Sequence, residues 1–434
     1  MTSKAAPRDD VPRWGSSPAA CVIDTVRATL CAFVESTPRD VRLKGFLPTF
    51  LPSRLLPFVF PLDGKYQNMR TAFKASEMVR KATKAAPPLP PMAGVKFGTL
   101  FAPYMMCVEY NTTEGWGKPE IRDFGPLSLM PQSGSLHYAL QCFEGMKAYH
   151  TADGIRLFRP DMNVARLNSS HKRLAFPTVD EKEWVECLKE FVLANRTWIP
   201  AEEQHSLYLR PTTIATNHNL MVGPSDRVLH YIIASPVGPY YPTGFKPVRL
   251  VAENKARRAF PGGTGAYKLG ANYAGPIMHQ VEYTKKNFQQ ILWLAPDNTV
   301  DEVGAMNFMM LWKNEQGKRE LITAPLDGTI LPGVTRNSIL QLARDMKEID
   351  VVSEKRVHID AIMKGLREGR VEELFGCGTA AIVTAVNFLQ FGEEGLAVPC
   401  PETSVTRGFM EKLVNIQYGR TQGHPWSVKI ADTA

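Results

Sequence analysis

The sequence predicts two α/β domains joined by a short, open linker. Apolar segments with the alternation of β-strands occur at 154–160, 206–216 and 228–238. Residues 180–195 have an Asp start and the apolar spacing of an amphipathic helix. New strand and helix patterns follow 237–247, a stretch rich in Pro and Gly that suits a connection between domains.

The domain boundaries follow from changes in these patterns. Residues 1–86 contain frequent prolines and no sustained period, so we expect an irregular basic extension, and PPLPP at 87–91 indicates a stiff entry to the folded part. A smaller α/β domain is expected at 87–236 and a larger one at 248–434. The larger domain is expected to contain strands at 248–253 and 290–295 and helices near 272–286, 337–348 and 358–368.

Composition excludes several classes of protein. The chain has 434 residues, of which 44% are hydrophobic and 22% charged, as in ordinary globular proteins. No run of eighteen apolar residues occurs, so we expect no membrane span. Residues 1–86 hold 14 Lys and Arg against 7 Asp and Glu, whereas 87–434 hold 37 against 36. Because the folded part is electrically balanced, we do not expect nucleic-acid binding.

Cysteine and histidine spacing gives no sign of a disulfide framework or a metal site. The seven cysteines are odd in number and include no CxxC pair. Reduced thiols of an intracellular protein fit this pattern better than disulfides. The nine histidines form no HxxxH or HExxH pair, so no metal ligands are predicted.

Lys268 is a candidate amine nucleophile. It lies in GGTGAYKLGANYAG (262–275), and no acidic residue occurs within thirteen positions on either side. Uncharged surroundings can lower the pKa of a lysine, which a Schiff-base former needs. On its own, however, this fragment favours a surface lysine in a glycine-rich loop.

A second candidate is an anion site at the start of the helix pattern in LPGVTRNSILQLARDM (331–346). Pro and Gly form a turn, Thr335 takes the N-cap position, and the apolar period of a helix follows. The free N–H groups at such a start bind phosphate well. A plain capped helix is the more common outcome of this motif alone.

Glu302 directly precedes a very apolar run that ends at Trp312. A carboxylate at the edge of a buried strand needs a cationic or hydrogen-bonding partner, whereas an exposed turn acid would need none. The neighbouring acid, Asp301, should point to the other side of the strand and tolerate Asn.

Two further segments place functional groups together. Tyr208 and Arg210 share one face of a predicted strand, because residues two apart point the same way. Small residues around Thr379 and Ala380 would let backbone amides approach a ligand closely.

These candidates belong to a longer series of segments in a fixed order: SLHYALQCFEGMKAY (135–149), LFRPDMNVARL (157–167), LYLRP (207–211), GAYKLGANYAG (265–275), DEVGAMN (301–307), ILPGVTRNS (330–338), FGCGTA (375–380) and IQYG (416–419). The series resembles the branched-chain aminotransferases of the D-alanine-aminotransferase-like fold. The resemblance runs from about Phe97 to Gly419. It implies a two-domain α+β fold with pyridoxal phosphate between the domains.

The resemblance also implies the roles of individual residues. Lys268 would hold the cofactor as a Schiff base, Glu302 would face its pyridine nitrogen, and Tyr273 would bind its phenolate oxygen. The phosphate would be held by Arg166, Val334, Thr335 and Thr379. The substrate pocket would be lined by Phe143, Tyr208, Arg210, Tyr240 and Ala380. In a homodimer, Tyr138, Leu220 and Val222 would reach the neighbouring subunit's site.

The expected activity is transamination of leucine, isoleucine and valine with 2-oxoglutarate. Another enzyme of the same fold, such as a D-amino acid aminotransferase or an aminodeoxychorismate lyase, is the main alternative, and a non-catalytic binding protein is a further one. Two places depart from the vertebrate pattern: Ala305 replaces a Thr that helps to hold the substrate carboxylate, and Ala381 and Thr384 replace a redox-sensing CxxC. The sequence leaves the compartment open between cytoplasm and mitochondrion.

Overall fold

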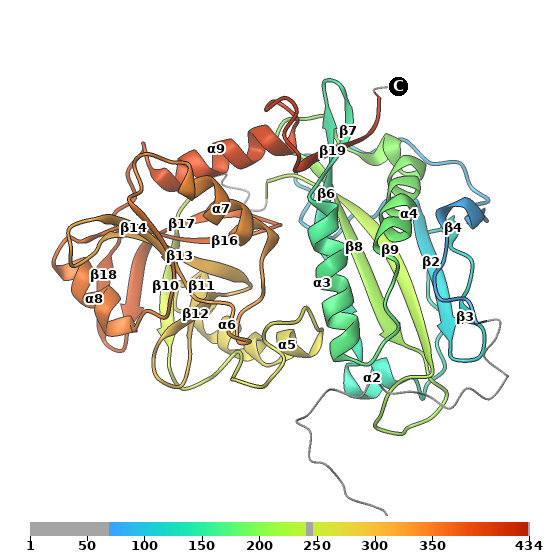
Figure 1. The fold of residues 1–434 in the computed structure, drawn as a ribbon, viewed down its shortest axis with the longest axis horizontal. Helices are drawn as coiled ribbons and strands as arrows, with labels where there is room; N and C mark the ends of the chain where they lie inside the picture. Colours follow the sequence, from blue (N-terminus) through green and yellow to red (C-terminus); the bar gives the residue numbers. More distant parts are fainter. Residues whose placement is uncertain (1–68, 240–245, 433–434) are drawn as a thin grey trace, which may run out of the picture. The chain divides into compact units, whose positions relative to one another are not determined.

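The computed structural model describes residues 69–239 and 246–432. These residues form two β-sheets with helices packed on them (Figure 1). The helices are η1 (Ala75–Glu77), α2 (Gly134–Tyr138), α3 (Pro160–Arg173), α4 (Glu181–Ala194), η2 (Arg196–Trp198), α5 (Ala271–Ala274), α6 (Pro276–Lys285), α7 (Val334–Arg344), α8 (Ile359–Arg367) and α9 (Val405–Gln417).

The first sheet has its strands in the order β1-β4-β2-β9-β8-β6-β7-β19, with β3 paired to β2 and β5 paired to β8. The long strands β8 and β9 form an antiparallel pair at its centre. Its strands are β1 (Val79–Arg80), β2 (Tyr104–Asn111), β3 (Gly115–Trp116), β4 (Glu120–Asp123), β5 (Gln141–Phe143), β6 (Met146–Thr151), β7 (Gly154–Phe158), β8 (Ser206–Ala215), β9 (Arg227–Val237) and β19 (Ser427–Ala431).

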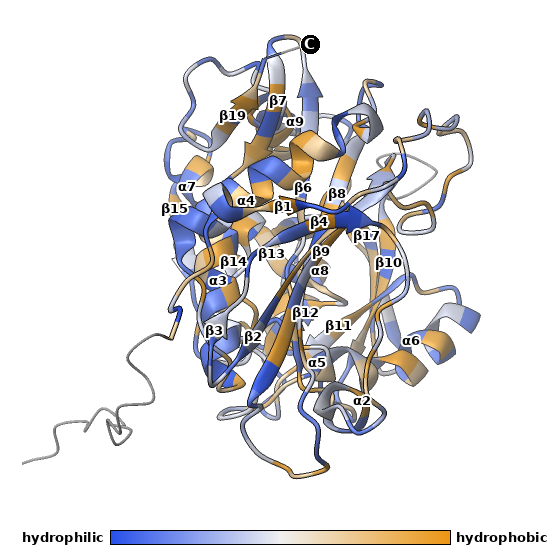
Figure 2. Cartoon of the chain, turned by 90° about the vertical axis from the view of Figure 1, so that its right-hand side faces the viewer, coloured by the Kyte–Doolittle hydropathy of each residue, from blue (hydrophilic) through white to orange (hydrophobic). Residues whose placement is uncertain are grey.

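Helices α3 and α4 cover one face of the first sheet (Figure 1). Asp180 caps α4 as the sequence predicts, because its side chain accepts hydrogen bonds from the N–H groups of Lys182 and Glu183. The apolar side of α4, which includes the fully buried Trp184 and Phe191, packs into the core of this sheet. In Figure 2, α4 carries both hydrophilic and hydrophobic residues, as expected of an amphipathic helix.

Both ends of the described chain belong to the first sheet, which corrects two expected boundaries. Phe73 is 1% exposed in the core, and β1 pairs with β4, so the irregular extension does not reach residue 86. Strand β19 pairs with β7, so the chain after α9 returns from the second sheet to the first. Local periodicity cannot reveal such pairings, because each partner strand is far away in sequence.

Part of the second sheet closes on itself. The path β12-β11-β10-β17-β16-β13 returns to β12 through the β12–β13 pairing, and β14 and β15 extend it from β13. Its strands are β10 (Val248–Glu253), β11 (Gln290–Leu294), β12 (Val300–Val303), β13 (Met306–Lys313), β14 (Arg319–Thr323), β15 (Val351–Glu354), β16 (Val371–Gly378), β17 (Ile382–Phe391) and β18 (Glu394–Ala397).

The predicted elements of this half occur with shifted ends. Strands β10 and β11 match their expected ranges closely, and α8 lies at the expected helix near 358–368. The helix expected near 272–286 is divided at Gly275 into α5 and α6. Helix α7 begins three residues earlier than expected, and its N-cap is Gly333 rather than Thr335.

Two buried histidines share one hydroxyl in the core of the first sheet. His171 Nδ1 lies 2.8 Å from the carbonyl oxygen of Pro177, so this nitrogen carries the proton. His171 Nε2 then accepts from Thr213 Oγ1, which itself accepts from His230 Nδ1, each at 2.8 Å. Trp184 Nε1 donates to His230 Nε2 at 3.0 Å. Each ring is therefore neutral with a single tautomer.

This network should respond to loss of the shared hydroxyl. Thr213→Val leaves His171 Nε2 and His230 Nδ1 without partners, and each unsatisfied buried group costs about 1–3 kcal/mol. We expect the melting temperature to fall by several degrees. Thr113→Val, at an exposed turn position, is the matched control. A Thr213→Val protein that melts with the parent would contradict the network.

The histidines also give the sign of a pH effect. Burial lowers the pKa of His171 to about 4 and that of His230 to about 3. An unfolded histidine has a pKa near 6.5, so the unfolded chain binds more protons below that pH. The parent should therefore lose stability as pH falls from about 6.5 towards 4, and His230→Gln should flatten this slope in melting experiments.

Candidate active site

A cavity of about 660 Å³ is lined by residues of both sheets. Its lining includes eleven of the predicted site residues: Phe143, Arg166, Tyr208, Arg210, Lys268, Tyr273, Glu302, Val334, Thr335, Thr379 and Ala380. These residues come from strands, helix starts and turns that are far apart in sequence. The fold therefore brings the sequence candidates into one place.

Lys268 is fixed at its backbone, and its amine points into the cavity. Its N–H donates to Ser170 Oγ at 3.0 Å, and its carbonyl accepts from the Phe143 N–H at 3.0 Å. The Lys268 Nζ donates to Tyr273 Oη at 3.1 Å and lies 4.8 Å from the centre of the Phe143 ring. A lysine held in this way presents a directed amine to a ligand.

Glu302 on β12 is 2% exposed and has three partners. Arg258 Nε lies 2.9 Å from Oε2, while the Leu331 N–H and Asn307 Nδ2 donate to Oε1 at 2.8 and 3.1 Å. Burial raises the pKa of Glu302, and the charge of Arg258 and the Leu331 N–H oppose that rise. The sequence expectation of a cationic or hydrogen-bonding partner is met by both kinds of group.

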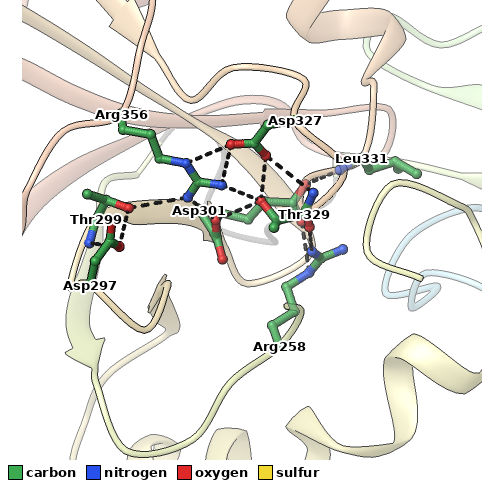
Figure 3. A network of polar contacts seen from close by, with 9 residues as sticks. Arg258, Asp297, Thr299, Asp301, Asp327, Thr329, Leu331 and Arg356 are labelled. Atoms are coloured by element: carbon green, nitrogen blue, oxygen red, sulfur yellow. Dashed lines mark hydrogen bonds and ion pairs between the residues drawn. The ribbon is translucent and has the colours of Figure 1, made fainter. Parts of the chain in front are cut away.

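The neighbouring acid faces away from the cavity, as the strand alternation predicts. Asp301 Oδ1 accepts from Arg356 Nη1 at 2.6 Å and from Thr329 Oγ1 at 3.0 Å (Figure 3). Its side chain is 2% exposed. The expected tolerance of Asn at this position does not fit the structure, because the half-buried Arg356 would lose one of its two carboxylate partners and keep only Asp327.

One end of the cavity is suited to an anion. Helix α7 begins at Val334, and the first N–H groups of a helix have no partner within it. Arg166 reaches the same point, where its Nη1 donates to the Pro332 carbonyl at 3.1 Å. Its Nε and Nη2 each lie 2.8 Å from an oxygen of Glu144, which is fully buried. This two-point ion pair holds the guanidinium at the helix start.

The other end of the cavity combines aromatic rings with a positive charge. Arg210 Nη2 donates to Tyr208 Oη at 3.0 Å, and the guanidinium lies 4.7 Å from the centre of the Phe143 ring. Arg210 Nε is buried and has no hydrogen-bond partner among the described residues. A buried donor without a partner beside a cavity is suited to an anionic ligand group.

The turn at 379–381 is supported from its far side. Lys147 Nζ donates to the Ala380 carbonyl at 2.9 Å. Lys147 is 7% exposed, and burial lowers its pKa to about 8. This contact fixes the peptide that follows Ala380, a residue that lines the cavity.

Comparison with known proteins assigns the family. A family model described as amino-transferase class IV matches residues 141–388. A branched-chain-amino-acid aminotransferase of Dictyostelium discoideum is 47% identical over 338 residues, which are 76% of this chain and 89% of that protein. The chain belongs to the class IV aminotransferases and, within them, to the branched-chain-amino-acid aminotransferases. The resemblance predicted from the sequence is therefore confirmed.

Further branched-chain-amino-acid aminotransferases carry names that state a compartment. The cytosolic protein of Saccharomyces cerevisiae is 41% identical, over 82% of this chain and 98% of its own. The mitochondrial protein of Schizosaccharomyces pombe is 42% identical, over 80% and 83%. These are the two compartments that the sequence left open.

Solved structures confirm the predicted fold class. The branched-chain aminotransferase of Thermoproteus uzoniensis, crystallised with norvaline, aligns with a TM-score of 0.62 at 22% identity, over 76% of this chain and 100% of that one. Another branched-chain amino acid aminotransferase, complexed with N-(5'-phosphopyridoxyl)-L-glutamate, gives 0.57 at 24% identity, over 75% and 98%. This aminotransferase chain thus has their two-domain fold.

Three predicted residues of this aminotransferase do not line the cavity, and a fourth is not described. Tyr240 lies outside the described residues. Tyr138, Leu220 and Val222 are 37%, 59% and 82% exposed, and Tyr138 Oη donates to the Leu220 carbonyl at 2.6 Å. Their expected role in a neighbouring subunit's site stays a prediction.

Several residues of the site were missed from the sequence. Thr212 continues the alternation of Tyr208 and Arg210 along β8, so that pattern could have found it. Arg258 and Asn307 hold Glu302. Asn307 lies in the quoted segment 301–307 and faces Glu302 across the β12–β13 pair, whereas no local pattern links Arg258 to Glu302. The uncharged setting inferred for Lys268 was also incomplete, because Glu302 lies close enough for the two charges to interact.

The two departures from the vertebrate pattern have different places in the structure. Ala305 lines the cavity in the turn between β12 and β13, where its methyl group offers no hydroxyl. Ala381 lines it beside Ala380, and Thr384 is buried on β17. Among the described residues, no group of three or more His, Cys, Asp or Glu side chains could hold a metal ion. No described helix is long and apolar enough to cross a membrane.

Proposed function

We propose that this chain transfers amino groups from leucine, isoleucine and valine to 2-oxoglutarate, with pyridoxal phosphate in the cavity of Lys268. One observation carries the proposal. An amine, a phenol and a buried carboxylate, from Lys268, Tyr273 and Glu302, line one cavity whose far end meets the start of helix α7. Family membership supports an aminotransferase, and this set of groups supports the cofactor.

The groups around the cavity suit the parts of pyridoxal phosphate. The N–H groups at Val334 and Thr335, the Thr379 side chain and Arg166 would hold a phosphate. Glu302 would face a ring nitrogen and Tyr273 a ring oxygen. When bound, the cofactor supplies an electron sink for the substrate's α-carbon.

Lys268 would both anchor the cofactor and move a proton. Its Nζ has the position of a general base and acid that would take the proton from the substrate α-carbon and deliver it to the C4′ carbon of the cofactor. The Tyr273 hydroxyl, 3.1 Å away, would direct Nζ during that transfer. Glu302, as a carboxylate, would keep the facing ring nitrogen protonated.

The part of the cavity around Arg210 could bind both a branched apolar side chain and the carboxylate side chain of glutamate. The rings of Phe143, Tyr208 and Tyr231, with Ile233, give an apolar lining that suits a branched side chain. Arg210 lies among these rings with Nε unpaired, so it could meet the distal carboxylate of glutamate or 2-oxoglutarate. The Ala380 N–H would bind the α-carboxylate of either substrate.

A homodimer is the second part of the proposal. Apolar side chains that are more than a third exposed gather on α2 and on the loop between β8 and β9, namely Leu136, Tyr138, Leu220, Met221 and Val222. Exposed apolar patches commonly mark protein interfaces. We expect sedimentation to give about twice the chain mass of 48.4 kDa. Val222→Asp should shift the protein towards monomer, and a monomeric parent would contradict this part.

The activity itself is tested with a panel of amino donors and 2-oxoglutarate. L-Leucine, L-isoleucine and L-valine should react, whereas D-alanine should not. Lys268→Ala should abolish the reaction in a folded protein, because the amine that anchors the cofactor and moves the proton is lost. The matched control is Lys285→Ala, at an exposed position of α6. After borohydride reduction of the parent, mass spectrometry should find the cofactor on Lys268, and label on another lysine would overturn the assignment.

Glu302→Gln tests the acid that faces the ring. The change keeps the shape and removes the charge, so the ring nitrogen should lose its proton at neutral pH. A nearby opposite charge commonly shifts a pKa by about 1–3 units, and one unit corresponds to about 1.4 kcal/mol. We expect kcat to fall at least about tenfold with the cofactor still bound. Exposed Glu315→Gln is the control, and unchanged turnover in Glu302→Gln would exclude this role.

A further inference from the structure

Residues 327–332, between β14 and α7, hold Glu302 directly and through Arg258. The Leu331 N–H donates to Glu302 Oε1 at 2.8 Å. The Thr329 carbonyl accepts from Arg258 Nη1 at 3.0 Å, and Arg258 in turn pairs with Glu302. The direct hydrogen bond and the ion pair on Glu302 therefore both depend on where this segment lies.

The same segment contacts other parts of the site. The Pro332 carbonyl accepts from Arg166 at 3.1 Å. Gly265, three residues before Lys268, lies against the Thr329 carbonyl so closely that a Cβ on Gly265 would overlap it. A displacement of 327–332 would move the anion end, the lysine segment and the ring-facing acid together.

Arg356 links this segment to β12 through hydrogen bonds to Asp327, Thr329 and Asp301 (Figure 3). Its Nε donates to Asp327 Oδ2 at 2.8 Å and its Nη2 to Thr329 Oγ1 at 2.7 Å. Its Nη1 lies 2.6 Å from Oδ1 of Asp301, the residue before Glu302. One planar guanidinium thus links Asp301, the neighbour of Glu302 on β12, to Asp327 and Thr329 in the segment.

Without Arg356, the link between Asp301 and this segment would rest on the Thr329 hydroxyl. Thr329 Oγ1 lies 3.0 Å from an oxygen of Asp301 and 3.0 Å from an oxygen of Asp327. A hydroxyl has one proton and can donate to only one of these carboxylates at a time. With Arg356 removed, two carboxylates would face each other across a single hydroxyl, and their repulsion would push the segment away from β12.

We propose that Arg356 is a positioning residue for Glu302, acting through residues 327–332. The inference rests on the proposed function, in which Glu302 faces the cofactor ring. Arg356 touches neither the cavity nor any ligand in it. Its effect is on the alignment of the Glu302 carboxylate with the ring nitrogen.

The first experiment compares Arg356→Met with Arg319→Met in the full-length holoenzyme. Arg319 is a matched control, since its Nε binds Glu372 at 2.6 Å and its Nη1 binds the Glu348 carbonyl, away from residues 327–332. Small misplacements of a catalytic group can cost up to about 100-fold in rate. We expect Arg356→Met to lower kcat by about 10- to 100-fold with KM for leucine changed less than about threefold, and Arg319→Met to leave both unchanged.

The second experiment asks whether Arg356 acts through Glu302. In a Glu302→Gln background, Arg356→Met should lower kcat by less than about twofold, because residues that act as a unit are not additive. The absorbance of bound cofactor gives a readout apart from turnover. Arg356→Met should shift its pH titration in the same direction as Glu302→Gln does. Arg356→Lys should recover part of both effects.

The possible outcomes separate the two claims. Full additivity with Glu302→Gln, or an Arg356→Met protein that behaves like Arg319→Met, would overturn the positioning role and leave the proposed function intact. A parent that binds no pyridoxal phosphate and transaminates no donor would overturn both. If Arg356→Met fails to fold, Asp327→Asn, whose side chain is 37% exposed, should give a smaller change of the same kind, and no change in kcat or absorbance would refute the proposal.

Discussion

A carboxylate removed from water must be held by charges and donors, and the site is arranged around this requirement at Glu302. Its three partners come from the β10–α5 connection, β13 and the segment before α7. No one of these elements supplies all three partners of Glu302. The need to satisfy one buried acid therefore fixes how several distant parts of the second sheet meet.

The same constraint explains why polar contacts accumulate on both sides of β12. Alternation along the strand sends Glu302 to the cavity and Asp301 to the opposite side. Each acid then has an arginine, Arg258 on one side and Arg356 on the other. The segment at 327–332 lies against both, so the buried charges become one connected network rather than two isolated pairs.

Lys268 depends on the first sheet in a comparable way. Its backbone is tied to β5 through the Phe143 N–H and to α3 through Ser170. The amine therefore belongs to the chain that precedes α5, but its position is set by strands and helices of the other half. The cavity is consequently a property of the two sheets together.

Local patterns predicted the elements whose capping residues or apolar periodicity lie within one segment. The helix at α4 was visible from Asp180 and its apolar spacing, and β8 and β10 from their alternation. The pairings of β1 and β19 were not visible, because short strands of two and five residues carry too little pattern and their partners are distant in sequence.

The sequence by itself predicted which groups are proposed to react. Lys268, Tyr273 and Glu302 were recognisable because their segments occur in a fixed order with distinctive neighbours. Only the tertiary structure decided which residues support them. Arg258 and Arg356 lie outside every quoted motif, and their importance arises from hydrogen bonds and ion pairs between elements that meet only after folding. The sequence states the chemical type of each side chain directly. The electrostatic environment of a buried group is instead set by the groups that the fold places within a few ångströms of it.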